Sequence, residues 1–279
     1  MTGEEARAAG GITASKASPP AFDTSTAHQA RMYDHLLGGK DNYAADRAAT
    51  EAWLEVDPDI AFTVRSNRAF LGRAVRYLTA QAGIRQFLDI GTGIPTAGNT
   101  HHVAQAIAPE TRVVYVDYDP VVLAHARALL TSHEAGATDY VDADLRDTAT
   151  ILGQAAELLD FTKPVAITLL AILHVIPDAD DPAAIVGRLL DAVPAGSYLA
   201  LSHLGADLID QNKQDGVKGV AGRMIQQMPT YRSRERVARF FDGTDLAEPG
   251  LVRVEEWRRE AGADEAGSSS LWCGVGRKR

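Results

Sequence analysis

An apolar segment that runs straight into an acidic, glycine-containing turn constrains the fold most strongly. Residues 87–93 read Phe-Leu-Asp-Ile-Gly-Thr-Gly, and a second apolar segment, residues 113–117, also ends in an acid, Asp117. The residues between the two segments are typical of a helix. Glycines let a backbone approach a ligand closely, and an acid after the second strand can bind the two hydroxyls of a ribose. The pattern predicts a βαβ unit that binds a nucleotide-like ligand.

Strands and helices alternate along most of the chain. We expect seven strands, at residues 85–90, 112–116, 139–141, within 164–173, and at 196–202, 251–257 and 270–275. Helices are expected at residues 98–107, 119–130, 147–159, 181–193 and 233–241, whereas residues 205–229 show little periodicity. Such alternation is typical of an α/β fold with a doubly wound, mostly parallel sheet. Only a short polar loop joins the last two strands, so one of these is predicted to be antiparallel.

The N-terminal part follows a different pattern. Residues 1–25 lack periodic apolar residues and are predicted to form a disordered tail. Three helices are expected within residues 28–82, with a break at residues 37–43, Leu-Gly-Gly-Lys-Asp-Asn-Tyr. We therefore expect a helical cap at residues 26–82 and a ligand-binding domain at residues 83–279. The break is either a simple helix end with an Asn or Asp cap, or part of a lid over the ligand.

Composition and charge disfavour several classes of protein. The net charge of −9 and the pI of about 5.4 argue against binding to nucleic acid or to an anionic membrane. No apolar run reaches about 18 residues, so no membrane span is expected. Cys273 is the single cysteine, which rules out a disulfide framework and favours a reducing compartment, the cytoplasm. We interpret a run of four arginines as a solvated helix face: Arg232, Arg234, Arg236 and Arg239.

Four segments are expected to converge where doubly wound sheets bind ligands, at the carboxyl ends of the strands. These segments are residues 89–96, 117–118, 142–145 and 171–174. The dinucleotide fingerprint Gly-x-Gly-x-x-Gly is incomplete, because Gly91 and Gly93 fit but Thr96 occupies the third position and Pro95 stiffens the turn. The third glycine serves close packing around a pyrophosphate. A nicotinamide-dependent oxidoreductase is therefore disfavoured.

These segments resemble the motifs of class I S-adenosylmethionine-dependent methyltransferases. Asp117 matches the acid that binds the ribose hydroxyls in that class, and Tyr118 matches the side chain that stacks near the adenine. Asp144 and Leu145 resemble the motif that reads the adenine edge. The first motif of the class is similar to Asp89-Ile90-Gly91-Thr92-Gly93. The departure is Pro95, which stands where many members have a third glycine.

The resemblance covers residues 85–279 and carries expectations for fold and cofactor. It implies a Rossmann-like sheet with an antiparallel C-terminal strand, S-adenosyl-L-methionine as the cofactor and S-adenosyl-L-homocysteine as the product. The N-terminal part is similar to a family of actinobacterial proteins named as methyltransferases by resemblance. The similarity lies in residues 30–43, which contain Leu-Leu-Gly-Gly-Lys-Asp-Asn-Tyr, and in residues 67–71, Asn-Arg-Ala-Phe-Leu. This similarity predicts the cofactor of the protein more readily than the reaction that it catalyses.

Residues at the expected site suggest how the chemistry could proceed. His174 follows the fourth strand and is a candidate general base; the alternatives are a wall of the cofactor pocket and a structural histidine. Tyr33 and Arg68 could reach the methionine end of the cofactor, because an arginine fork suits a carboxylate, although Arg68 could equally form a surface ion pair. His203, after the fifth strand, could face the substrate. The eight histidines show no metal-ligand spacing, and no metal is expected.

The first hypothesis for function is a methyltransferase that acts on a small molecule. Acidic net charge and a helical cap favour a small acceptor, and residues 170–173 read Leu-Ala-Ile-Leu where base-methylating enzymes carry Asn-Pro-Pro-Tyr. The alternative is a non-catalytic protein that binds S-adenosylmethionine as a sensor or regulator. This alternative stays open because the sequence motifs indicate cofactor-binding residues more clearly than catalytic residues. The sequence leaves the acceptor and the oligomeric state open.

Overall fold

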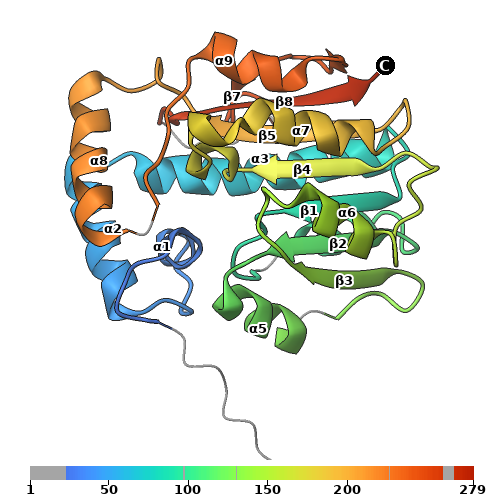
Figure 1. Ribbon diagram of the computed structural model, residues 1–279, viewed down its shortest axis with the longest axis horizontal. Helices are drawn as coiled ribbons and strands as arrows, with labels where there is room; N and C mark the ends of the chain where they lie inside the picture. Colours follow the sequence, from blue (N-terminus) through green and yellow to red (C-terminus); the bar gives the residue numbers. More distant parts are fainter. Residues whose placement is uncertain (1–22, 97, 130, 226, 260–266) are drawn as a thin grey trace, which may run out of the picture.

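The fold is built on a mixed β-sheet with helices on both faces (Figure 1). The computed structural model describes residues 23–96, 98–129, 131–225, 227–259 and 267–279. All but the last three residues of the predicted disordered tail lie outside this part of the chain. Among the described residues no helix is long and apolar enough to cross a membrane.

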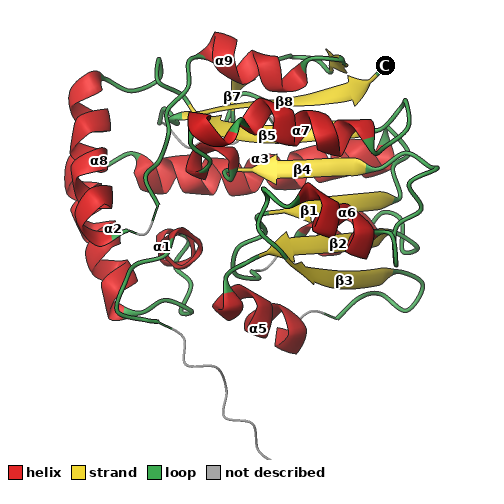
Figure 2. Cartoon of the chain, viewed as in Figure 1, coloured by secondary structure: helices red, strands yellow, loops and turns green. Residues whose placement is uncertain are grey.

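The sheet has the order β3-β2-β1-β4-β5-β8-β6, and β7 pairs with β8. Five strands run parallel: β1 (Gln86–Ile90), β2 (Arg112–Asp117), β3 (Ala137–Asp142), β4 (Ala166–Leu170) and β5 (Tyr198–Leu204). The remaining three are antiparallel to their neighbours: β6 (Thr244–Leu246), β7 (Val252–Arg253) and β8 (Leu271–Lys278). Figure 2 shows the arrow of β8 pointing against those of the parallel strands. The doubly wound fold and its antiparallel C-terminal strand are thereby confirmed.

The sheet contains eight strands within the described residues, one more than the seven expected. The additional strand, β6, has three residues, of which Asp245 and Leu246 are exposed. So short a strand with an exposed apolar side chain gives neither an apolar run nor an alternating pattern. It forms because β8 offers it a free edge, which is a tertiary effect.

Each face of the sheet has its own core because side chains alternate along a strand. Phe87 packs with Phe70 of α3 (Ile60–Ala80), on the face that α4 (Thr100–Gln105) also covers. Leu88 packs on the opposite face with Ile151 and Leu189. That face is covered by α6 (Thr148–Ala155), α7 (Pro182–Asp191) and α9 (Arg234–Ala238). All five residues of β1 are buried, as expected of a strand covered on both faces.

A helical cap lies beyond the carboxyl ends of the parallel strands (Figure 1). It consists of α1 (Gln29–Leu36), α2 (Ala44–Val56) and α8 (Gln211–Met224). Helix α8 falls in residues 205–229, where we expected little periodic structure. Asp210 caps it by accepting a hydrogen bond from the backbone of Lys213, and Gly216 lies so close to Val56 of α2 that a β-carbon would overlap it. Gly216, one of the glycines that weaken the helical signal, thus allows α8 to pack on α2.

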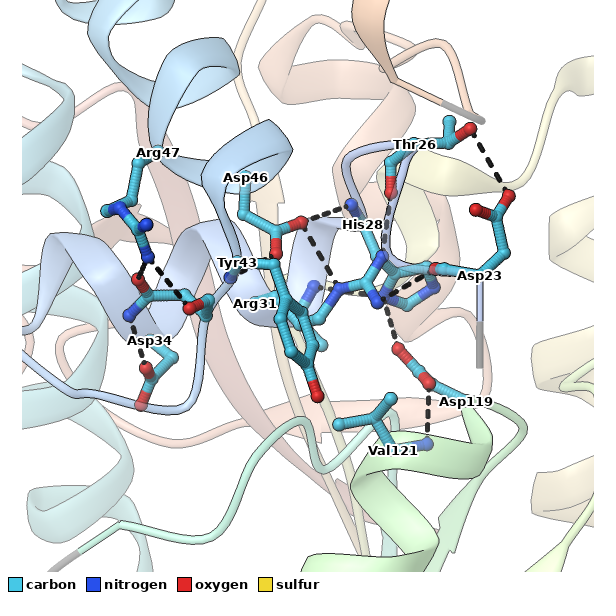
Figure 3. Close-up of polar contacts among 12 residues, drawn as sticks. Asp23, Thr26, His28, Arg31, Asp34, Tyr43, Asp46, Arg47, Asp119 and Val121 are labelled. Carbon is cyan, nitrogen blue, oxygen red and sulfur yellow. Dashed lines mark hydrogen bonds and ion pairs between the residues drawn. The ribbon is translucent and has the colours of Figure 1, made fainter. Parts of the chain in front are cut away.

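A buried ion pair joins α1 to α2 inside the cap (Figure 3). Arg31 Nε donates to Asp46 Oδ1 over 3.2 Å, and both side chains are almost completely buried. The Asp46 carboxylate also accepts the backbone N–H groups of His28 and Tyr43, at 2.9 and 2.8 Å. Because its remaining lone pairs are used in this way, the buried charge is well compensated.

The segment 38–43 forms a loop around the carboxylate of Asp34. Asp34 is buried and accepts hydrogen bonds from Asp41 N and Asn42 Nδ2, both at 2.9 Å. Gly38 adopts a φ of +79°, which favours glycine, and a β-carbon on Gly39 would overlap the Asp34 carboxylate. These contacts fit the first interpretation of the segment, a helix end fixed by Asp and Asn.

We predict that Gly39→Ala destabilises the cap. Asp34 is held by two hydrogen bonds and cannot move aside, so the free energy of unfolding should fall by about 2 kcal/mol. Urea unfolding followed by circular dichroism measures this change. The matched control is Gly153→Ala in α6, where an added β-carbon meets nothing within 4 Å. Equal stability of the Gly39 and Gly153 variants would contradict the packing described.

Burial of His101 makes stability depend on pH. The His101 backbone N–H donates to the hydroxyl of Tyr115 over 2.9 Å, and His101 Nδ1 lies 2.7 Å from the same oxygen. Burial, with a smaller contribution from His102, lowers the pKa of His101 from 6.5 to about 4. Between these two values the unfolded chain binds a proton that the folded chain does not. Stability is therefore lost as the pH falls from about 6.5 towards 4.

We predict that His101→Asn reduces this acid sensitivity. Between pH 7 and pH 5 the wild-type protein should lose up to about 2 kcal/mol of stability through His101, and the variant should not lose this part. Urea unfolding at both pH values gives the difference, with His133→Asn on the exposed surface as control. An unchanged pH dependence in the His101 variant would show that His101 is charged in the folded state.

Candidate active site

A cavity lies between the cap and the carboxyl ends of the strands. All residues from Asp89 to Thr96 line it, together with Asp117, Tyr118 and residues 143–146. Ala171 and His174, after β4, complete this wall. The four segments expected from the sequence therefore meet at one cavity, as predicted, although Asp142 itself is exposed and lies outside the wall. The opposite wall comes from the cap and from α3.

The glycine turn needs its two glycines for different reasons. Gly91 has a φ of +75°, and a β-carbon there would overlap Ile172 from the loop after β4. Gly93 has a φ of +62°, but a β-carbon there would meet only Ala30 at 3.9 Å. Gly91 thus allows two loops to pack, whereas Gly93 keeps a backbone N–H close to Asp117. The conformation favours glycine at both positions.

Asp89 ties three elements together beneath this turn. Its carboxylate accepts hydrogen bonds from the hydroxyls of Thr100 in α4 and Thr168 in β4, both at 2.6 Å. Burial raises the pKa of Asp89, and these hydroxyls and Arg68 partly offset the rise. Both carboxylate oxygens therefore have protein partners, so Asp89 supports the wall of the cavity.

Asp117 lies where the turn meets the end of β2. Its Oδ1 accepts from the backbone N–H groups of Tyr118 and Asp119, at 2.8 and 3.0 Å, and its Oδ2 accepts from Gly93 N at 2.9 Å. Burial raises the pKa of Asp117, whereas the N–H groups of Asp119 and Gly93 lower it. A carboxylate has about four lone-pair sites, so one remains for a hydroxyl in the cavity.

The N-terminus of α1 contacts the residues that follow Asp117 (Figure 3). His28 Nδ1 lies 2.9 Å from Asp119 Oδ2, and His28 Nε2 lies 3.4 Å from the hydroxyl of Tyr118. Gln227 Nε2 donates to the same hydroxyl over 2.7 Å. Sequence reasoning missed His28 and Gln227, and no local signal marks them, because their partners are about 90 and 109 residues away in the chain.

Asp144 and Leu145 differ in their surroundings. Leu145 is buried in the core, whereas the side chain of Asp144 is partly exposed and bound by Arg146. Arg146 Nη1 lies 2.8 Å from Asp144 Oδ2 and 3.1 Å from Oδ1, and its Nε donates to Asp180 over 2.6 Å. Arg146 also lines the cavity, although its sequence position gave no sign of it.

Tyr33 and Arg68 lie on the cap side of the cavity. The Tyr33 hydroxyl donates to Val64 O over 3.2 Å and accepts from Asn67 Nδ2 at 3.0 Å. Arg68 Nη2 donates to Asn99 Oδ1 over 2.7 Å, so a buried amide contacts the guanidinium. Both residues line the same cavity as the glycine turn.

His174 lines the cavity from a short 3-10 helix, η1 (Leu173–Val175). The side chain is buried, and among the described residues its Nδ1 has no hydrogen-bond partner. Burial, reinforced by the nearby Arg232, lowers the pKa of His174 to about 4. The ring is therefore neutral at physiological pH, with a lone pair on one ring nitrogen.

Arg232 corrects the interpretation of the arginine run. Arg234, Arg236 and Arg239 are exposed, as expected, but only 1% of the Arg232 side chain is exposed. Arg232 precedes α9 and forms an isolated β-bridge with Gly205, with its side chain buried. Its guanidinium donates to Leu173 O at 3.1 Å, Ile176 O at 2.8 Å, Asp178 Oδ1 at 2.8 Å and His203 Nε2 at 2.6 Å. It thereby holds the loop that carries His174.

His203 does not face the substrate cavity, contrary to the sequence interpretation. It is completely buried, with Nδ1 2.8 Å from Leu204 O and Nε2 in contact with Arg232. His101 and His102 are likewise absent from the wall of the cavity among the described residues. Within the same part of the chain, no group of three or more His, Cys, Asp or Glu side chains could hold a metal ion.

Comparison with solved structures identifies close relatives. A DUF574 family protein from Streptomyces avermitilis is 43% identical and has a TM-score of 0.87, covering 92% of this chain and 99% of its own. A candidate methyltransferase from Thermobifida fusca is 38% identical with a TM-score of 0.84, covering 95% and 100%. An S-adenosylmethionine-dependent methyltransferase from Anabaena variabilis shares 14% identity and the fold alone, with a TM-score of 0.50 over 74% and 84%.

The family follows from a match along almost the whole chain. A search of curated proteins finds no match. A family model described as S-adenosyl methyltransferase matches residues 15–279. This range includes the cap, the glycine turn and the C-terminal antiparallel strand. The chain therefore belongs to the S-adenosyl methyltransferase family and is an S-adenosylmethionine-dependent methyltransferase of Rossmann-like class I fold.

Proposed function

We propose that the chain transfers the methyl group of S-adenosylmethionine to a small molecule that binds beneath the cap. One observation carries the proposal: a single cavity is lined both by the motifs at the strand ends and by α1, α2 and α3. An acceptor that reaches the cofactor must fit between these helices and the sheet. The net charge of −9 also disfavours a nucleic-acid acceptor.

The wall of the cavity suits the cofactor. Asp117 has one free lone-pair site for a ribose hydroxyl, and Tyr118 with Asp144 and Leu145 would border the adenine. Gly91, Thr92 and Gly93 would lie along the methionine chain, with Asp89, Tyr33 and Arg68 near its amino and carboxylate groups. Thr96 Oγ1, on the same turn, is buried and lacks a partner among the described residues. Because Thr96 also lines the cavity, a ligand bound there would supply the missing partner.

His174 is the residue we propose to contact the acceptor. The cofactor, when bound, supplies a methyl group on a sulfonium: the acceptor atom bonds to the methyl carbon as the carbon–sulfur bond breaks, and the bonding electrons stay on sulfur. Neutral His174 can accept a hydrogen bond from an acceptor hydroxyl and take its proton as the new bond forms. Because its pKa is about 4, His174 is a weak base, and alignment contributes more than proton affinity.

Asp117→Ala should weaken binding of S-adenosylmethionine by about 1.5–3 kcal/mol, the scale of lost hydrogen bonds to a charged group. Isothermal titration calorimetry measures this directly. The matched control is Asp142→Ala, because Asp142 pairs with Asp117 in register but lies outside the cavity wall. Alanine leaves three backbone N–H groups unpaired, so Asp117→Asn is the second variant. Unchanged affinity in both folded variants would remove Asp117 from the site.

His174→Ala should abolish turnover and spare the affinity for S-adenosylmethionine, because the ring is proposed to contact only the acceptor. Release of S-adenosylhomocysteine with an acceptor from a small-molecule screen measures turnover, and calorimetry measures affinity. The exposed His133→Ala variant serves as control. Wild-type turnover in the His174 variant would eliminate this role, whereas loss of cofactor affinity would assign His174 to the cofactor pocket.

A further inference from the structure

We infer that the methyl acceptor is an uncharged, largely apolar molecule with a hydroxyl group, bound on the β5–β8 side of the cavity. The inference rests on the proposed function and adds the chemical class of the acceptor. Three features of the described residues carry it: the division of the cavity wall, the location of its charged groups, and two buried ring nitrogens that lack partners.

The strand order divides the cavity into two sides. The three acids proposed to surround the cofactor are Asp89 in β1, Asp117 at the end of β2 and Asp144 just after β3, all on one side of β4. On the other side, the last residue of β5, Leu204, pairs in register with the first residue of β8, Leu271, and both line the cavity. The sheet thus offers carboxylates on the cofactor side and leucines on the opposite side.

The cap and the start of α3 continue this apolar surface. Met32 of α1, Trp53 of α2 and Ile60 at the start of α3 belong to one buried cluster and also line the cavity. Thr63, one turn after Ile60 in α3, accepts from the backbone N–H of Ser270 at 3.1 Å, and Ser270 is next to Leu271. This contact places the cluster on the leucine side of the sheet. An acceptor that fills this space would bury apolar surface, which favours binding.

Charged side chains on the described wall are held by other groups or lie on the cofactor side. Asp34 holds the loop 38–43, Arg146 binds Asp144 and Asp180, and Arg68, which donates to Asn99, is the group proposed to lie near the cofactor carboxylate. Leu204, Leu271 and the three helix residues named above contribute no charge. A charged acceptor would lose its hydration there without gaining a counter-charge, which is costly.

Two ring nitrogens define the polar requirements. Trp53 and His174 both line the cavity, each side chain is only 8% exposed, and neither Trp53 Nε1 nor His174 Nδ1 has a partner among the described residues. A buried polar group without a partner costs free energy, and a ligand that supplies the partner removes this cost. The indole N–H only donates, so it requires an oxygen acceptor. The neutral imidazole accepts from the hydroxyl that becomes methylated.

The test uses matched neutral and charged probes with protein saturated in S-adenosylhomocysteine. The probes are 2-naphthol, 2-naphthoate and 2-naphthylmethylamine, and the same three groups on biphenyl. By calorimetry we expect at least one of the two phenols to bind, and to bind about tenfold or more tightly than its own carboxylate and amine. Equal or tighter binding of the charged probes, or no binding of either phenol, would overturn the inference.

Two variants locate the acceptor. Trp53→Phe should weaken binding of the phenol about fivefold and leave S-adenosylhomocysteine affinity unchanged, whereas the control Trp272→Phe, outside the wall, should change neither. Ile60→Asp places a carboxylate at the first residue of α3, where an acid suits the helix dipole. It should raise affinity for the amine probe at least fivefold. Unaltered selectivity in the Ile60 variant would overturn the proposed location.

Failure of this inference can be told apart from failure of the proposed function. If S-adenosylhomocysteine and S-adenosylmethionine do not bind, the cofactor site is wrong and the proposed function fails with it. If both bind but the charged probes are preferred, the methyltransferase site stands and only the class of the acceptor is overturned.

Discussion

The buried carboxylate of Asp117 is the interaction on which the site depends. Three backbone N–H groups converge on it, from Gly93 in the glycine turn and from Tyr118 and Asp119 after β2. These bonds offset the cost of burying the charge and fix the two loops relative to each other. Asp119, two residues on, lies within 2.9 Å of His28 at the start of α1. The segment 117–119 therefore positions the glycine turn, the end of β2 and the cap relative to one another. The cavity forms where these three parts meet.

Sequence signals predicted those parts of the fold whose causes are local. The glycine turn and the acid of β2 follow from a strand that ends in particular residue types, and Asp181 followed by Pro182 marks the start of α7. Helix α8 and the buried role of Arg232 were missed for the opposite reason. Gly216 is explained by Val56 of another helix, and Arg232 by carbonyls of a loop more than 50 residues earlier. Such partners can be recognised only after the chain has folded.

Arg232 shows how a buried cation can shape a loop through backbone carbonyls as well as through an ion pair. One of the groups that accept hydrogen bonds from Arg232 is the carboxylate of Asp178. This carboxylate is half exposed and also pairs with Arg236. The other acceptors are two carbonyls and a histidine nitrogen. The guanidinium gathers the carbonyls of Leu173 and Ile176, on either side of His174 and Val175. Burial lowers the pKa of His174 and keeps the ring unprotonated, and the positive charge of Arg232 adds to this effect. Arg232 therefore contributes both to the geometry and to the protonation state of this loop.

Polar and apolar contacts are distributed unevenly between the cap and the sheet. Within the cap, α1, α2 and α8 share an apolar cluster, and the Arg31–Asp46 ion pair joins α1 to α2. Across the cavity, α1 meets the strand ends through polar groups, such as His28 with Asp119 and Tyr33 with Asn67, whose amide oxygen accepts from Ser202 of β5. Single hydrogen bonds of this kind contribute little net free energy, because water can replace either partner. The cap is therefore held together internally more strongly than it is held to the strand ends, and a ligand that enters between them exchanges polar contacts without disrupting a core.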